Sequence, residues 1–478
     1  MAEVGDGGGW IGTLSVDAGR ADVGRAGGHS DDPLSRPRNG HDEAMRQRTL
    51  DLLLVSVLAG SAGLTAPVMR SSQQSTPCGS ARAASLTGLT SAGRVAWRTT
   101  LPHPQDSGTT AEIVAGGTVY ADLSGAVTAV NESNGRIRWS RALGTEVHGE
   151  WLIGRTLVVD VDQVGRHAQV VGLNPTSGAL DWRYRPGGDG LYADPVPAGD
   201  VGLVIIASSH ELGLVDAASG RLRWHHWTAS PDQPVTDGTT VAVAAGNTMR
   251  GFAVATGDLR WTRGGIDSSA LPTLDEGVVA IGSQVTPDQT PIAGYELATG
   301  RRAWTLSLDA GSWQLTATTA GLVAVQEYPV DQGGLDLVEP ATGHIAWRSS
   351  IGHPAFLATP PVAVGSNLAM VVQLPQDGPS FAALRNLTTG SLVASYRLRS
   401  SEVPLTLAAL GPDLYGTGLG PDRKTESGFV ERIGFDGVIW RLILPQPAQT
   451  SPVALPEGGI AIQTEDLGCF TAWARRGR

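Results

Sequence analysis

A repeat of about 42 residues, a Gly–Trp pair at the same place in each copy, and short β-branched runs between turn residues predict an all-β fold. The Gly-to-Gly spacings from Gly93 to Gly390 are 42, 43, 42, 37, 43, 43 and 47 residues. Forty-odd residues is the length of one four-stranded propeller blade. The sequence therefore predicts a β-propeller of four-stranded blades.

The recurring element runs from an acidic residue or Asn, through Ser/Thr and Gly, to a Trp four residues after the Gly. The first side chain opens a turn, and the Gly takes the positive-φ position that ends it. An even spacing along a strand predicts that the Gly and the Trp point to the same face. We expect the Trp to pack in the seam between neighbouring blades. The predicted structural residues are Trp97, Trp139, Trp182, Trp224, Trp261, Trp304, Trp347 and Trp440, with Gly135, Gly178, Gly220, Gly257, Gly300 and Gly343.

Two later copies are weaker. The copy at Asn386–Gly390 has Ala394 where the Trp would stand, and the copy at Phe435–Gly437 reaches Trp440 after one residue fewer. Eight repeats look complete, and two fragments remain at the ends of the repeat region. Residues 450–473 supply three inner strands and residues 93–100 the missing outer strand, so pairing them closes the ring. We expect eight blades, with nine as the alternative.

The amino-terminal part divides into three segments. Residues 1–44, rich in Gly, Asp and Arg, are expected to be a disordered tail or a mis-called extension. Residues 45–69 combine a basic head, a seven-residue apolar run and small residues, which is typical of a signal peptide or signal anchor. Residues 70–92 are read as a linker, 93–473 as the propeller and 474–478 as a tail. Whether Met45 is the true start stays open.

Export would place the two cysteines in an oxidising compartment. Cys78 follows the export segment, and Cys469 lies ten residues from the carboxyl end. Because a ring brings its ends together, we predict a disulfide between them. Two unrelated thiols are the alternative, and a lipid-anchored Cys78 is a third reading that its polar lead-in disfavours.

Charge and motifs exclude several function classes. The net charge of −11 argues against nucleic-acid binding. The sole lysine, Lys424, follows Arg423, which excludes a phosphate-binding loop. His225 and His226 are adjacent, so in a strand they point apart and do not suggest a metal site. The run Asp160-Val-Asp162 begins like a calcium loop but lacks the closing Glu, so we interpret it as a hairpin. No catalytic or metal-binding residue is predicted.

At the Asp-x-x-Thr-Gly-x-x-x-Trp turns the chain resembles the PQQ-like (quinoprotein-type) propeller repeat, over residues 93–473. The family includes quinoprotein dehydrogenases, the propeller lipoprotein of the outer-membrane β-barrel assembly machinery, and many envelope proteins. The dehydrogenases hold their quinone on two adjacent cysteines beside a calcium ion. Here Cys78 and Cys469 are 391 positions apart, so the comparison argues against bound PQQ, and no cofactor is predicted.

These observations favour an exported, extracytoplasmic, non-catalytic propeller that binds a protein or a cell-envelope component. The alternatives are a PQQ-dependent dehydrogenase-like enzyme and a membrane-anchored sensor domain. Because loops on a rigid ring carry function, three long inserts are candidate binding surface: Arg183–Asp194, Tyr328–Gly334 and Gly416–Gly428.

Overall fold

The computed structural model describes most of the chain between residues 84 and 464, and every helix or strand assigned in that part is a β-strand. The described residues are 84–101, 113–123, 125–163, 166–187, 191–207, 210–228, 231–266, 272–282, 289–309, 312–328, 334–351, 356–357, 359–373, 380–398, 406–419, 427–434, 437–444, 451–455 and 459–464.

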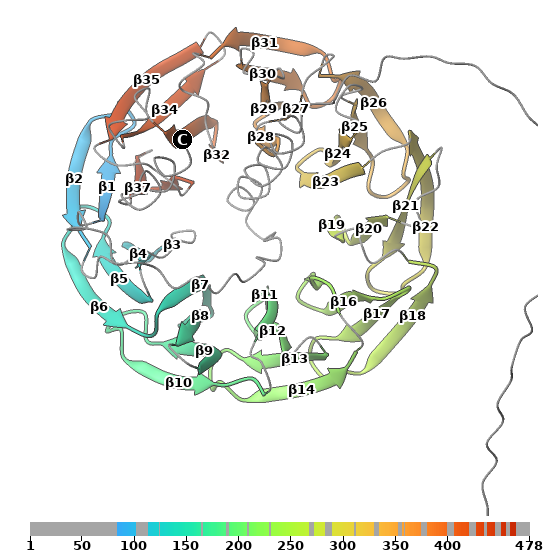
Figure 1. The fold of residues 1–478 in the computed structure, drawn as a ribbon, viewed down its shortest axis with the longest axis horizontal. Coiled ribbons are helices and arrows are strands. Elements are labelled where there is room, and N and C mark those ends of the chain that lie inside the picture. The colour runs from blue at the N-terminus through green and yellow to red at the C-terminus, as the bar shows by residue number, and fades with distance from the viewer. Residues whose placement is uncertain are drawn as a thin grey trace, which may run out of the picture. The chain divides into compact units, whose positions relative to one another are not determined.

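The described strands form nine antiparallel sheets that stand as blades around a ring (Figure 1). Blade 1 has β1 (Ser85–Leu89), β2 (Val95–Thr100), β36 (Val453–Ala454) and β37 (Ile460–Thr464); blade 2 has β3 (Ile113–Ala115), β4 (Thr118–Leu123), β5 (Ala126–Asn131) and β6 (Ile137–Ala142); blade 3 has β7 (Glu146–Ile153), β8 (Thr156–Gln163), β9 (Arg166–Leu173) and β10 (Leu180–Tyr184). Blade 4 has β11 (Leu191–Ala198), β12 (Gly202–Ala207), β13 (Glu211–Asp216) and β14 (Leu222–Trp227); blade 5 has β15 (Val235–Thr236), β16 (Thr240–Ala245), β17 (Thr248–Ala253) and β18 (Leu259–Gly264); blade 6 has β19 (Thr273–Asp275), β20 (Val278–Gly282), β21 (Gln289–Glu296) and β22 (Arg302–Asp309). Blade 7 has β23 (Ser312–Thr318), β24 (Gly321–Tyr328), β25 (Gly334–Val338) and β26 (Ile345–Ser350); blade 8 has β27 (Phe356–Leu357), β28 (Val362–Val364), β29 (Asn367–Gln373), β30 (Ser380–Asn386) and β31 (Leu392–Arg397); blade 9 has β32 (Thr406–Leu410), β33 (Asp413–Leu419), β34 (Gly428–Gly434) and β35 (Gly437–Leu444).

Blade 1 closes the ring with strands from both ends of the chain. The order in its sheet is β2-β1-β37-β36, and β1 pairs with β37 from Ser85↔Thr464 to Leu89↔Ile460. Closure by pairing terminal strands is therefore confirmed. The expected count of eight blades is wrong, because the two end fragments make a complete blade beside the eight repeats. Nine, the alternative, is correct.

The split of blade 1 also differs from the expectation. Each end contributes two strands, whereas the sequence suggested one strand from the amino-terminal side and three from the other. The additional strand is β1, which lies inside the segment 70–92 that we read as a linker. All five residues of β1 are buried, but only two of them are large and apolar, so the run does not stand out in the sequence as a buried strand.

A β-bulge sits between the turn and the Trp in every described pair of third and fourth strands. In blade 4, Leu214 pairs with Trp224 and Val215 with Leu222, which leaves Arg223 as the extra residue. A bulge inverts the alternation of side chains beyond it. The prediction that Gly and Trp share a face is therefore wrong: Gly220 contacts the Trp of the preceding blade, and Trp224 faces the following one.

Each repeat Trp lies against the turn of the next blade. The indole of Trp304 is 7% exposed, and its Nε1–H donates to the carbonyl of Pro340 in blade 7 at 2.6 Å. Gly343 lies over the ring at φ 69°, and a Cβ there would come within 2.5 Å of the indole. The other seven repeat tryptophans donate in the same way to the carbonyls of Glu132, Pro175, Ala217, Val254, Leu297, Leu387 and Ser91.

The seam between blades 8 and 9 has neither half of this contact. Ala394 occupies the Trp position, and the shortened turn of blade 9 places Gly437 with no atom within 4 Å of an added Cβ. This seam depends instead on aliphatic packing, for example of Leu384 and Leu398 with Leu407. Of the nine seams between described blades, eight contain a repeat indole and its hydrogen bond, and this seam contains neither.

The two faces of the ring differ in their connections. Successive strands of a blade alternate in direction, so first-to-second and third-to-fourth connections share one face, which we call the turn face. Second-to-third connections and the links between blades share the opposite face, which we call the loop face. The three candidate inserts join β10 to β11, β24 to β25 and β33 to β34, so all three belong to the loop face. The structure leaves residues 188–190, 329–333 and 420–426 of these inserts undescribed.

Candidate functional site

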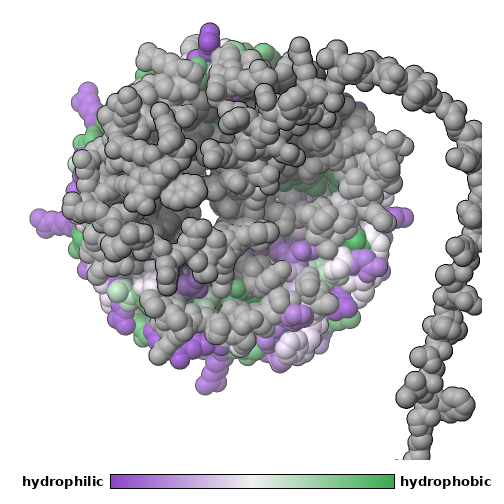
Figure 2. Space-filling model, viewed as in Figure 1, coloured by the Kyte–Doolittle hydropathy of each residue, from purple (hydrophilic) through white to green (hydrophobic). Residues whose placement is uncertain are grey.

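An apolar surface covers the outer strands of blades 8 and 9. Hydrophilic side chains project from much of the ring's rim (Figure 2), so exposed large apolar side chains stand out there. Of the ten such side chains among the described residues, five lie on β31 and β35, which are neighbours on the rim (Figure 1). We call these five the blade 8–9 rim: Leu392, Val393, Val438, Ile439 and Ile443.

The repeat explains part of this rim but not all of it. Leu392 and Val438 stand two residues before the Trp position, where other blades also carry exposed apolar residues such as Ile137. Val393 and Ile439 stand one residue before it, and they are 49% and 57% exposed. The same position in the other seven blades is small or charged: Ala96, Arg138, Asp181, Arg223, Arg260, Ala303 and Ala346.

Charge is also nearly absent from this rim. The only charged residue of β35 is Arg441, and its Nε donates to the fully buried Glu431 at 2.8 Å. β31 carries only Arg397, at its last position. Outer strands are unpaired sheet edges, which proteins usually protect with charges. An apolar, weakly charged edge beside the seam without an indole is typical of a protein-binding surface.

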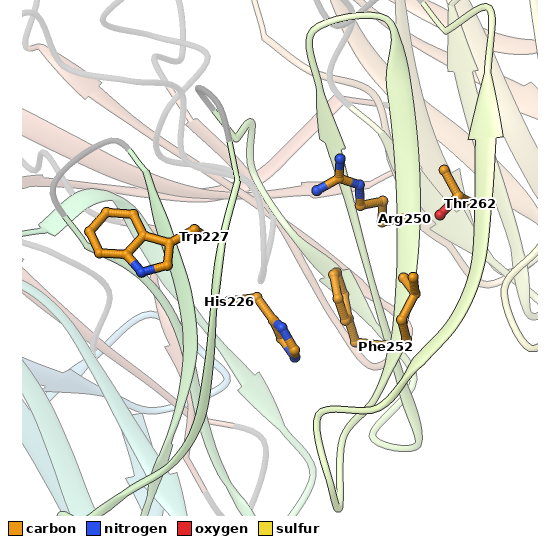
Figure 3. A pocket seen from close by; sticks show the side chains of 6 residues that line it. His226, Trp227, Arg250, Phe252 and Thr262 are labelled. Carbon is orange, nitrogen blue, oxygen red and sulfur yellow. The ribbon is translucent and has the colours of Figure 1, made fainter. Parts of the chain in front are cut away.

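A groove of about 300 Å³ lies on the rim between blades 4 and 5. His226 anchors its floor, because its Nε2 lies 2.6 Å from the carbonyl of Gly257 and its ring stacks on Phe252 at 4.6 Å. Figure 3 shows the indole of Trp227 on the other side of β14 from these rings, where it is 70% exposed. The lining residues are His226, Trp227, Arg250, Phe252, Leu259 and Thr262.

The adjacent histidines have separate partners. His225 Nδ1 lies 2.9 Å from Glu211 Oε1, a contact within blade 4, whereas His226 turns into the seam with blade 5. They therefore face apart, as strand geometry requires.

A histidine and several carboxylates meet at the loop-face end of blade 3. His148 Nε2 lies 3.1 Å from Asp162 Oδ2, and Glu146 pairs with Asp162 across β7 and β8. Asp160 is nearby and 3% exposed. Burial opposes the charged imidazole, but the hydrogen bond to Asp162 and the charges of Asp160, Asp162 and Glu146 outweigh it, and they raise the pKa of His148 to about 9. The sequence analysis interpreted Asp160–Asp162 as part of a hairpin, which the antiparallel β8–β9 pair confirms. It missed the cluster because Glu146 and His148 lie on the neighbouring strand β7.

The raised pKa makes stability depend on pH. A folded-state pKa near 9, above the usual 6.5, stabilises the folded protein fully below pH 6.5, and this contribution is lost as pH rises through 9. The quantity to compare is the free energy of unfolding of wild type minus that of His148→Gln. We expect this difference to be roughly 3 kcal/mol larger at pH 6 than at pH 10. Urea unfolding of both proteins in chelator-treated buffer at these two values measures the difference. A difference that does not change with pH would contradict the assignment.

Other sequence predictions fall outside the described residues. Cys78 and Cys469 both lie there, so their pairing stays a prediction, as does the export segment at 45–69. Among the residues that the structure does describe, no helix is long and apolar enough to cross a membrane.

Comparison with known proteins places the repeats in a family. The family model described as outer membrane protein assembly factor BamB matches residues 82–306. The crystal structure of BamB from Moraxella catarrhalis is similar at 16% identity and a TM-score of 0.46, over 76% of this chain and 98% of that one. The quinohemoprotein alcohol dehydrogenase ADHIIG from Pseudomonas putida HK5 is similar at 12% identity and a TM-score of 0.39, over 78% of this chain and 70% of that one. No curated protein matches the chain. With its repeated Gly–Trp turns and its ring of blades, the chain is a β-propeller, and its repeats at residues 82–306 match the PQQ-like family model.

Proposed function

We propose that this protein is an exported, non-catalytic scaffold of the cell envelope that binds a partner protein at the blade 8–9 rim. The observation that carries the proposal is the exposure of Val393 and Ile439 at a repeat position that is small or charged in the other seven blades. The basic head and apolar run of residues 45–69 support export. The matched family model, described as an outer membrane assembly factor, supports a place in the envelope.

The partner is expected to present an apolar segment to β31 and β35. Burying apolar area contributes about 25 cal/mol per Å², and β35 offers three exposed aliphatic side chains along one strand. The backbone edges of β31 and β35 have no neighbour within their own sheets, so an extended segment could also add a strand there. Ala394 supplies a small residue where the other seams hold an indole, so a bound partner would not meet an indole at this seam.

Replacing Val393 and Ile439 together by Arg is expected to weaken partner binding at least tenfold. Arginine already occupies this position in blades 2, 4 and 5, as Arg138, Arg223 and Arg260, so the fold should accept it. In intact cells, photo-crosslinkers placed at 393 and 439 should capture one defined partner. The affinity of that purified partner for wild type and for the double variant is then measured by calorimetry.

The matched control is Ile137→Arg in blade 2, an exposed apolar residue at the position equivalent to Val438. It should bind the partner like wild type. Equal binding by the double variant and wild type, or equal loss with Ile137→Arg, would overturn the proposal. Quinone absorbance and dye-linked oxidation after soaking with PQQ and calcium would favour the dehydrogenase alternative instead.

A further inference from the structure

We propose that Glu146, His148 and Asp162 form a binding site for a divalent first-row transition-metal ion at the loop-face end of blade 3. One nitrogen and two carboxylate groups offer donor atoms that all lie within 4.8 Å of one another. All three residues are half-buried, so an ion would be partly shielded from water while keeping open coordination positions. This inference is independent of the proposed partner surface, which lies on other blades.

The fold itself directs the three side chains to one place. Glu146 and Asp162 are directly opposite in the β7–β8 ladder, so their side chains share a face of the sheet. The register then shifts between Val147 and Gly149, which leaves His148 as an extra residue near Asp160. A bulge of this kind re-aims a side chain, and here it brings the imidazole to Asp162.

The donor set selects the class of ion. Imidazole nitrogen with carboxylate oxygen suits Zn²⁺ and its first-row neighbours, whereas Ca²⁺ and Mg²⁺ prefer sites built from oxygen alone. Asp160 is almost fully buried close to His148, so its negative charge would also favour a dication. Both ligand-bearing strands are paired in the four-stranded sheet of blade 3, so the site is already ordered before an ion arrives.

The charged groups that face His148 are Glu146 from β7 and Asp160 and Asp162 from β8. A dication bound by the imidazole would therefore be surrounded by three negatively charged side chains.

The test is calorimetric titration of the chelator-treated full chain with ZnCl₂ at pH 7.5. We expect one ion per chain and a higher Tm with zinc. His148→Ala and Asp162→Asn should each weaken binding at least a hundredfold. Far-UV circular dichroism and urea unfolding, which do not depend on zinc, show whether these variants still fold.

The matched control is His225→Ala, which removes the histidine of the His225–Glu211 pair in blade 4, a histidine–carboxylate contact of similar length. It should leave the zinc titration unchanged. The proposal is overturned if wild type binds no zinc, if folded His148→Ala binds as wild type does, or if His225→Ala abolishes binding.

Discussion

Trp304→Ala is expected to lower the free energy of unfolding by about 3–5 kcal/mol. The indole is 7% exposed and fills the space between Gly294 of its own blade and Gly343 of the next. Because both places hold glycine, neither has a side chain that could extend into the cavity that Ala would leave. The carbonyl of Pro340 would also lose its donor. Urea unfolding followed by tryptophan fluorescence and circular dichroism measures the change.

Two variants separate the causes of this loss. Trp304→Phe keeps most of the apolar volume but not the N–H group, so it should cost less than Ala while still removing about 1 kcal/mol for the hydrogen bond. Trp227→Ala removes an indole that is 70% exposed and should change stability by less than about 0.5 kcal/mol. A loss below about 1 kcal/mol for Trp304→Ala would contradict a seam role for the repeat tryptophans.

Ending the chain after residue 449 is expected to abolish cooperative unfolding. This deletion removes β36 and β37 and leaves β1, whose five residues are all buried, without its inner partner. Ile460 and Ile462 are at most 1% exposed, and burying an Ile contributes about 1.5–3 kcal/mol. Together with the lost ladder of five residue pairs, the deficit approaches a typical net stability of about 5–15 kcal/mol.

The truncated chain should be degraded rapidly by protease and should aggregate through the exposed edge of β1. A synthetic peptide of residues 450–464 added in trans should restore protection, and a scrambled peptide of the same composition should not. If the truncated chain unfolds with the same urea midpoint and slope as the full chain, the closure between the two ends contributes little.

The sequence predicted the blades because one residue type repeats at one structural place. The eight repeat tryptophans, from Trp97 to Trp440, mark the seams directly. Each packs against a turn glycine of the next blade, so Trp and Gly recur together in the sequence. The direction of each Trp could not be predicted, because the extra residue of the bulge, such as Arg223, has no sequence signature. β1 was missed because only Leu86 and Leu89 of its five residues are large and apolar.

The candidate sites show a different limit. The apolar character of Val393 and Ile439 becomes informative only when the repeats are aligned on their Trp and the exposure of that position is known. The blade 3 cluster depends on the register of β7 against β8, which sets Glu146 opposite Asp162 across sixteen positions of sequence.

The missing indole between blades 8 and 9 determines where this ring can part most easily. A closed ring opens as soon as one interface between neighbouring blades separates. Its resistance to opening therefore depends on the weakest interface rather than on the average one. That interface is not the junction of the two chain ends, where Trp440 reaches Ser91 and Trp97 reaches Glu132. The weakest interface, between blades 8 and 9, coincides with the rim where we place the partner. A protein bound there would hold the two blades together from outside. Occupancy there would add resistance to opening for the whole circle.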